Sequence, residues 1–146
     1  MSVSCDVCKA EYKLMNITPS DKAFADCVKA AYDNTCQKCG IHGRMENSHI
    51  HSRRHRTIRW CKENALPKCH GCHRWWHENP TESGKWFEDK YGPGLVELLR
   101  EKKNNKFKIP KVEEKEIAKH YRFELKKIKE KRIDGAVGYV DFLSYQ

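Results

Sequence analysis

The sequence predicts a small α+β fold in which helices are added at both ends of a compact core. The chain has 146 residues, which is room for one domain, with or without helical extensions. Only 38% of the residues are hydrophobic while 34% are charged, so the apolar core should be small. Eight cysteines are available to reinforce it, and segments with strand and helix patterns alternate around them.

The charge of the chain points to a polyanionic partner. Lysine and arginine exceed aspartate and glutamate by nine, and each phosphate that such side chains neutralise releases condensed counterions. DNA or another nucleic acid is therefore the first candidate, although charge alone is weak evidence. We expect no small-molecule cofactor, and the oligomeric state does not follow from the sequence.

The expected compartment is the cytoplasm. The chain contains no apolar run of about 18 residues, and its first residues lack the apolar segment of a signal peptide, so neither a membrane span nor secretion is expected. Thiols in the cytoplasm stay reduced. Paired Cys-x-x-Cys units are then better explained as metal ligands than as disulfides.

Three regions are expected along the chain. Residues 1–20 form an irregular arm that contains Cys5 and Cys8. Residues 21–111 form the main domain, which begins with a helix capped by Ser20 or Asp21 and ending near residue 33. Its apolar face consists of Phe24, Cys27, Val28 and Ala31.

The middle of the main domain should contain two strands and a helix. Residues 47–51 and 57–60 have strand character, residues 64–67 are expected as a loop, and a helix should run from about Cys69 through Trp76. Two short helices should then flank the turn at residues 91–94, which has the sequence Tyr-Gly-Pro-Gly.

Residues 112–146 are expected to be a charged helix followed by a tail. The helix should end near Arg132 and should bury a narrow apolar stripe. The stripe consists of Ile117, Tyr121, Leu125 and Ile128. The basic face of this helix is more simply explained as exposed to solvent than as a phosphate contact.

Two Cys-x-x-Cys units predict a structural zinc site. Cys36 and Cys39 form one unit and Cys69 and Cys72 the other, and together they supply the four thiolates of a closed tetrahedral site. Zinc binding could then drive the folding of a sparse core. The Cys5–Cys8 unit lacks an obvious second pair, so a second zinc site there is only an alternative.

The residues between and after these cysteines resemble the HNH (ββα-metal) endonuclease family. Ser48-His49-Ile50-His51, then Asn64, then Cys72-His73-Arg-Trp-Trp-His77 give the family's His, Asn, His order within the paired cysteines of its zinc-bearing branch. The resemblance covers about residues 21–111 and is closest to phage NinG-type recombination nucleases and related short phage proteins. It implies a zinc-stapled ββα-metal core.

The resemblance also implies roles for individual residues. His49 would be the general base, with His51 as the alternative because two residues that are two apart on a strand share a face. Asn64 would hold the segment that carries the base. His73 and His77, four residues apart on a helix, would bind one catalytic divalent cation such as Mg²⁺ or Mn²⁺. Four arginines would contact DNA phosphates, with Arg59 as the best family match: Arg53, Arg54, Arg56 and Arg59.

One position departs from the family. The residue before the base is usually an Asp or His that also binds the cation, but here it is Ser48. Water, a substrate phosphate, the Ser48 hydroxyl, Glu46 or His51 could complete the metal's ligands instead.

The expected activity is metal-dependent hydrolysis of DNA phosphodiester bonds, with DNA recombination, processing or junction resolution as its setting. The alternative is a non-catalytic, zinc-stabilised module that only binds nucleic acid. Such a module would need the cysteines and arginines, but it would not need His49, Asn64, His73 and His77 together.

Overall fold

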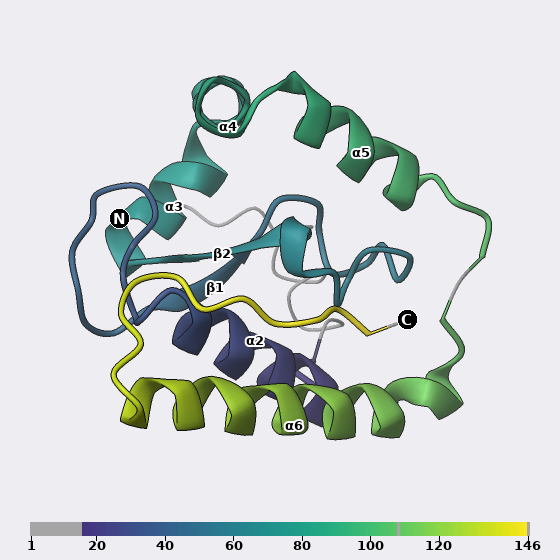
Figure 1. The fold of residues 1–146 in the computed structure, drawn as a ribbon. Coiled ribbons are helices and arrows are strands. Elements are labelled where there is room, and N and C mark those ends of the chain that lie inside the picture. Colours follow the sequence, from purple (N-terminus) through teal and green to yellow (C-terminus); the bar gives the residue numbers. More distant parts are fainter. Residues whose placement is uncertain (1–15, 108, 146) are drawn as a thin grey trace.

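The computed structural model describes residues 16–107 and 109–145, so the predictions for Cys5 and Cys8 lie outside the described residues. This part of the chain is α+β, with five α-helices and one two-stranded sheet (Figure 1). Within these ranges, no helix combines the length and the apolar character needed to cross a membrane. The elements are α2 (Pro19–Ala31), β1 (Glu46–His49), β2 (Ala65–Lys68), α3 (His70–Glu78), α4 (Pro80–Tyr91), α5 (Pro93–Lys103) and α6 (Glu114–Ile133), with 3-10 turns at Lys62–Asn64 and Lys111–Glu113.

Helix α2 begins with a capping box. The Thr18 hydroxyl accepts a hydrogen bond from the Asp21 backbone N–H (3.1 Å), and the Asp21 carboxylate accepts one from the Thr18 N–H (3.0 Å). The cap is therefore Thr18 rather than Ser20 or Asp21, because Pro19 has a backbone angle suited to the first helical position. The predicted apolar face is confirmed, since all four of its side chains are buried.

Helices α2 and α6 lie side by side and share the larger hydrophobic core (Figure 1). Ile117, Tyr121 and Ile128 of the predicted stripe are fully buried there. The segment after α6, for which the sequence suggested no structure, returns across this core. Its Val140 N–H donates to the Ala31 carbonyl (2.9 Å), and its Leu143 N–H donates to the Glu124 carboxylate (2.7 Å).

The partner of β1 differs from the one expected. Strand β1 pairs antiparallel with β2, Glu46 facing Lys68 and His49 facing Ala65, whereas residues 57–60 form turns. The Ile58 N–H donates back to the His55 carbonyl (3.0 Å), a pattern of tight turns. Ile58 and Trp60 are both buried, so alternating burial in a turn imitates the alternation of a strand.

Helix α3 follows β2 directly, and α4 and α5 continue from it to the opposite end of the molecule from α6 (Figure 1). The predicted helix from Cys69 is confirmed, with Cys69 as its N-cap, and the turn predicted at residues 91–94 separates α4 from α5. A second, smaller core lies under these helices and consists of Ile58, Leu66, Phe87 and Leu99.

Candidate functional site

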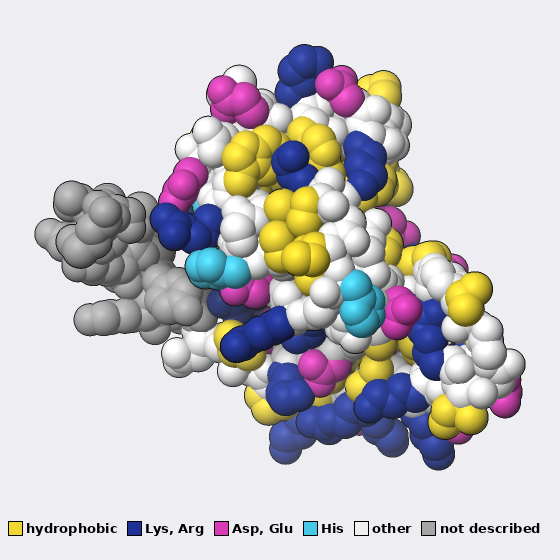
Figure 2. All heavy atoms as spheres, turned by 90° about the vertical axis from the view of Figure 1, so that its left-hand side faces the viewer, with side chains coloured by type: hydrophobic (Ala, Val, Ile, Leu, Met, Phe, Trp, Pro, Cys, Tyr) yellow, Lys and Arg dark blue, Asp and Glu magenta, His cyan; other side chains and the backbone are white. Residues whose placement is uncertain are grey.

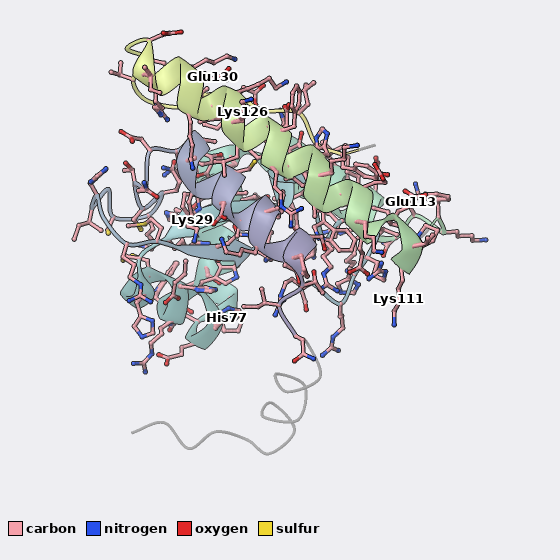
Figure 3. All side chains as sticks on the ribbon, turned by 90° about the horizontal axis from the view of Figure 1, so that it is seen from below. Lys29, His77, Lys111, Glu113, Lys126 and Glu130 are labelled. Atoms are coloured by element: carbon pink, nitrogen blue, oxygen red, sulfur yellow. The ribbon has the colours of Figure 1, made fainter. Side chains whose placement is uncertain are left out.

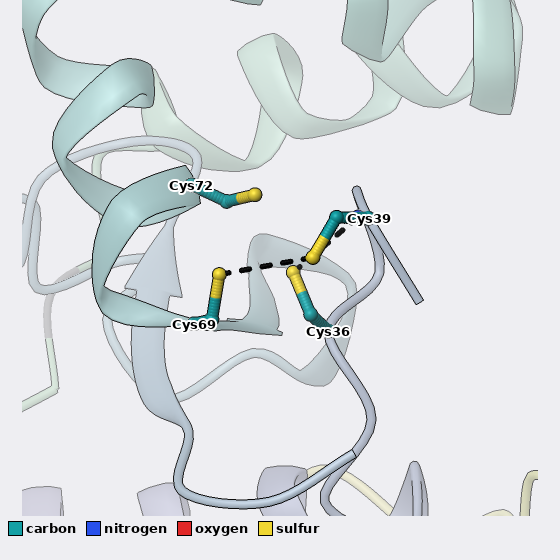
Figure 4. A group of neighbouring side chains, drawn as sticks. All are labelled: Cys36, Cys39, Cys69 and Cys72. Carbon is teal, nitrogen blue, oxygen red and sulfur yellow. Dashed lines mark hydrogen bonds between the residues drawn. The ribbon is translucent and has the colours of Figure 1, made fainter. Parts of the chain in front are cut away.

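The four predicted zinc ligands come together. Cys36 and Cys39 lie in the loop after α2, Cys69 caps α3 and Cys72 lies in its first turn, and their sulfur atoms point toward one another (Figure 4). All four sulfurs lie within 4.8 Å of one another. A set of four thiolates at this separation fits a structural metal ion such as zinc.

The loop that carries the first pair has the turn that such a site requires. The Cys39 N–H donates to the Cys36 sulfur (3.5 Å), and the Gly40 N–H donates to the Cys36 carbonyl (2.9 Å). Gly40 has a φ of 79°, which a residue with a side chain rarely adopts. Burial disfavours the Cys36 thiolate, but backbone N–H groups of Cys39, Cys69 and Lys38 outweigh it and lower its pKa to about 6.

A buried lysine lies beside the cysteine cluster. The Lys68 side chain is fully buried, donates to the Ser48 hydroxyl (2.9 Å), and places its ammonium 4.0 Å from the Trp76 ring centre. Burial lowers the pKa of Lys68 to about 8, while the negative charges of Cys36 and Cys72 act in the opposite direction. The sequence gives no sign of this residue's position, because residues 64–67 were expected as a loop and a lysine is ordinarily exposed.

His73 and His77 come together on α3 as predicted. Their Nε2 atoms are 3.0 Å apart. Two nitrogen ligands at adjacent positions of an octahedral ion are also about 3.0 Å apart when each metal–nitrogen bond is about 2.1 Å. The pair therefore fits two ligands of one divalent cation, although no third His, Cys, Asp or Glu among the described residues forms a compact cluster with them.

Glu46 holds His73 from the other side of its ring. Its carboxylate accepts a hydrogen bond from His73 Nδ1 (2.8 Å) and contacts His70 Nδ1 (3.0 Å). A carboxylate on Nδ1 fixes the proton there and leaves Nε2 free to bind a metal ion. Burial opposes ionisation of Glu46, but these two histidines lower its pKa.

The protein side chains that could supply a third ligand are placed less favourably. Ser48 is fully buried and its hydroxyl accepts the Lys68 hydrogen bond. His51 lies beyond the end of β1, so it does not share a strand face with His49. Glu46 contacts His73 at Nδ1 rather than near Nε2. Water or a substrate phosphate would therefore supply the remaining ligands of an ion bound by His73 and His77.

His49 is held in one tautomer. Its Nε2 lies 3.1 Å from the Arg59 carbonyl oxygen, which can only accept, so Nε2 carries the proton and Nδ1 keeps its lone pair. Burial lowers the pKa of His49 to about 4, against a smaller opposing effect of the Arg59 carbonyl. The imidazole is therefore neutral at physiological pH, as a general base must be.

Asn64 joins the segments on either side of it. Its side-chain oxygen accepts from the His51 N–H (2.8 Å), and its side-chain nitrogen donates to the carbonyls of His51 (2.9 Å) and Ile58 (3.3 Å). The Asn64 side chain is fully buried. Its hydrogen bonds join the chain that leaves β1 to the turn at residues 57–60.

Arg53, Arg56 and Arg59, which were predicted to bind DNA, contact other residues of the fold. Asp21 accepts hydrogen bonds from Arg59 Nε (2.9 Å), Arg59 Nη2 (2.6 Å) and Arg53 Nη1 (3.1 Å). Arg56 donates to a backbone carbonyl and pairs with Glu114 (2.8 Å), while Arg54 is exposed. Contacts from these arginines to phosphate stay predictions. The contacts between Asp21 and these arginines were not predicted, because Asp21 is distant from the arginines in sequence.

One cleft brings together the three histidines His49, His73 and His77. A cavity of about 1260 Å³ is lined by His49, His73, His77, Glu46 and Arg53. His51 is not among its lining residues. Two more sides of the cleft come from α2 and α6, which contribute Lys29 and Lys129 among others. The cleft thus brings a neutral imidazole, a histidine pair and cationic side chains to one open surface.

Comparisons of the chain with protein-family models, curated proteins and solved structures give no match. The resemblance to the HNH family therefore depends on the residue pattern alone.

Proposed function

We propose that the chain is a metal-dependent DNA endonuclease of the HNH class. The observation that carries the proposal is the meeting of His49, His73 and His77 in one cleft, with the two α3 histidines placed as ligands of a single ion. The order β1, β2, α3 supports the proposal, because in the ββα arrangement that the family resemblance implies the base would lie on the first strand and the ligand pair on the helix. The cysteine cluster would fasten α3 to the loop after α2.

In the proposed reaction His49 accepts a proton from water at Nδ1, while the proton on Nε2 stays hydrogen-bonded to the Arg59 carbonyl. A divalent cation such as Mg²⁺ or Mn²⁺, held by His73 and His77, would polarise the scissile phosphate and stabilise the leaving 3′ oxygen. Glu46 orients His73, and Asn64 holds the chain beyond His49. Arg53, which lines the cleft, would offset negative charge on the phosphate.

The competing proposal is a zinc-stabilised module that binds nucleic acid without cutting it. A binding module has no use for a histidine pair oriented by a carboxylate, or for a histidine held in a single neutral tautomer. These contacts favour the enzyme. Among nuclease settings, recombination and junction resolution are distinguished by comparing cleavage of plasmid, linear duplex, single-stranded and four-way-junction DNA.

Metal counting tests the proposed ion site. The purified wild type should hold zinc tightly and should bind one further Mn²⁺, which titration followed by electron paramagnetic resonance measures. His73→Ala should keep the zinc and lose the Mn²⁺. His42→Ala is a matched control, because His42 is an exposed histidine that does not line the cleft, and it should keep both ions. Equal Mn²⁺ binding by wild type and His73→Ala would exclude the histidine pair as the ion's ligands.

A further inference from the structure

Five cationic side chains form a single stripe along α6. They are spaced four, three, four and three residues apart, a pattern that places them on one face of a helix. The five residues are Lys115, Lys119, Arg122, Lys126 and Lys129. All five are exposed, and none makes an ion pair or a side-chain hydrogen bond with another residue in the described ranges.

The fold does not account for this stripe. Like charges three or four residues apart repel one another and disfavour a helix. The opposite face of α6 already secures the helix, since Ile117, Tyr121 and Ile128 are buried against α2. Neighbouring Lys127, by contrast, pairs with Glu124 at 2.5 Å. An unpaired cationic row on an otherwise well-packed helix is therefore expected to have an anionic partner.

The stripe continues into the candidate catalytic cleft. Lys129 lines the same cavity as His49 and His77, and Arg122 lines a smaller adjoining hollow beside α2. Seen from below, Lys126, Lys29 and His77 follow one another from α6 across α2 to α3 (Figure 3). Figure 2 shows Lys and Arg side chains gathered along the lower edge of the face on which histidines are also exposed.

The length of the stripe suits a nucleic-acid backbone. From Lys115 to Lys129 is 14 residues, or about 21 Å along the helix axis at 1.5 Å per residue. Duplex DNA rises 3.4 Å per base pair, so about six base pairs pass along that distance. DNA that enters the cleft must also continue over the surface beside it, and the stripe reaches the cleft at Lys129.

We propose that the α6 stripe binds the phosphate backbone of duplex DNA that flanks the cleavage site. The inference rests on the proposed nuclease function for the choice of DNA as the polyanion. Its contacts are electrostatic and independent of base sequence, because lysines and arginines in this arrangement meet only phosphates. The stripe thus fixes the path of the duplex, and the cleft acts on the strand presented to it.

The test compares two triple variants with equal charge. Lys119→Gln/Arg122→Gln/Lys126→Gln neutralises the centre of the stripe, and Lys85→Gln/Arg100→Gln/Lys106→Gln removes three exposed cations from α4, α5 and the segment after α5. Glutamine favours helices about as well as lysine, so α6 should persist, which circular dichroism checks. Affinity for a 30-base-pair duplex is measured against salt concentration without added divalent ion.

If the stripe binds phosphate, its variant should lose about 2.7 units from the slope of log affinity against log salt, 0.9 for each contact. The control should keep nearly the wild-type slope. An unchanged slope in the stripe variant, or an equal loss in both variants, would overturn the proposal. Preserved DNA binding together with lost binding of an acidic protein or of RNA would assign the stripe to that partner instead and would also overturn it.

This measurement separates the inference from the proposed function. A wild type that cuts no DNA while its stripe variant loses the salt slope would refute the nuclease and leave the stripe as a DNA contact. A wild type that cuts DNA while its stripe variant keeps the slope would refute only the stripe.

Discussion

Replacing Asn64 by alanine should both destabilise the fold and impair the proposed reaction. The buried side chain makes three hydrogen bonds to the backbone of His51 and Ile58. At about 1 kcal/mol each, their loss amounts to about 3 kcal/mol, and unpaired buried groups would increase it. A domain of this size is stable by about 5 to 15 kcal/mol, so the variant should still fold.

Urea unfolding at saturating zinc measures the effect. With a slope of about 2 kcal/mol per molar urea, the midpoint of Asn64→Ala should fall by about 1.5 M. Asn104→Ala, at an exposed asparagine without a side-chain hydrogen bond in the described structure, should change the free energy of unfolding by less than about 0.5 kcal/mol. Plasmid nicking under conditions where the variant is folded should be slower, because the chain beyond His49 is no longer held.

Asn64→Asp separates hydrogen bonding from packing. The carboxylate keeps the size of the side chain and the acceptor for the His51 N–H, but it turns an acceptor toward two carbonyls. It should therefore destabilise the fold at neutral pH at least as much as alanine does. A near-wild-type midpoint for both variants would refute the positioning role of Asn64.

Three further predictions concern the zinc site, the base and the carboxylate. Cys36→Ser and Cys72→Ser should each lose tightly bound zinc and cooperative unfolding, whereas Cys61→Ser, outside the cluster, should keep both. Metal analysis measures the bound zinc, and calorimetry measures the cooperativity of unfolding. Burial lowers the pKa of His49 to about 4. Between pH 4 and about 6.5, His49 therefore binds a proton in the unfolded chain but not in the folded one. The free energy of unfolding should fall by up to about 3 kcal/mol as the pH drops through this range. His49→Gln should lack that loss in urea unfolding at stepped pH, and identical pH dependence of the two proteins would contradict the assignment. Glu46→Gln should weaken Mn²⁺ binding about 10- to 100-fold without releasing zinc, and unchanged Mn²⁺ affinity would mean that Glu46 does not orient the ligand.

The features that sequence predicts well are those set by spacing. The two-residue spacer in each cysteine pair and the apolar faces of α2 and α6 are local properties, and both were found where expected. The helix at His73 and His77 follows from the same reasoning, because a separation of four residues places two side chains on one face.

Features set by tertiary contacts were not accessible to that reasoning. Residues 57–60 carry strand-like alternation, yet β1 pairs with Ala65–Lys68, although Pro67 cannot donate a hydrogen bond. In a two-stranded sheet both strands are edges, and an edge tolerates proline. A proline in the sequence is therefore a weaker sign against a strand here than in a larger sheet, and a buried turn can carry a strand-like pattern.

The contacts of buried charged side chains could not be predicted from local sequence patterns either. Arg59 and Asp21 are 38 residues apart, and Lys68 donates to a serine 20 residues away, so nothing in local spacing links them. The returning C-terminal segment is a further case. Its side chains show no regular period, and its position depends on hydrogen bonds to α2 and α6.

Nicking of supercoiled plasmid by wild type and His49→Ala, side by side, is the most direct test of the proposed nuclease. With Mg²⁺ or Mn²⁺ the wild type should convert supercoiled to open-circular DNA, and chelator should abolish the reaction. His49→Ala should keep its zinc, its Mn²⁺ binding and its DNA affinity while nicking about 10² to 10⁴ times more slowly. Full activity in His49→Ala with loss in His51→Ala would move the base to His51. A wild type that binds DNA but cuts no substrate with either ion would contradict the enzyme and leave the binding module.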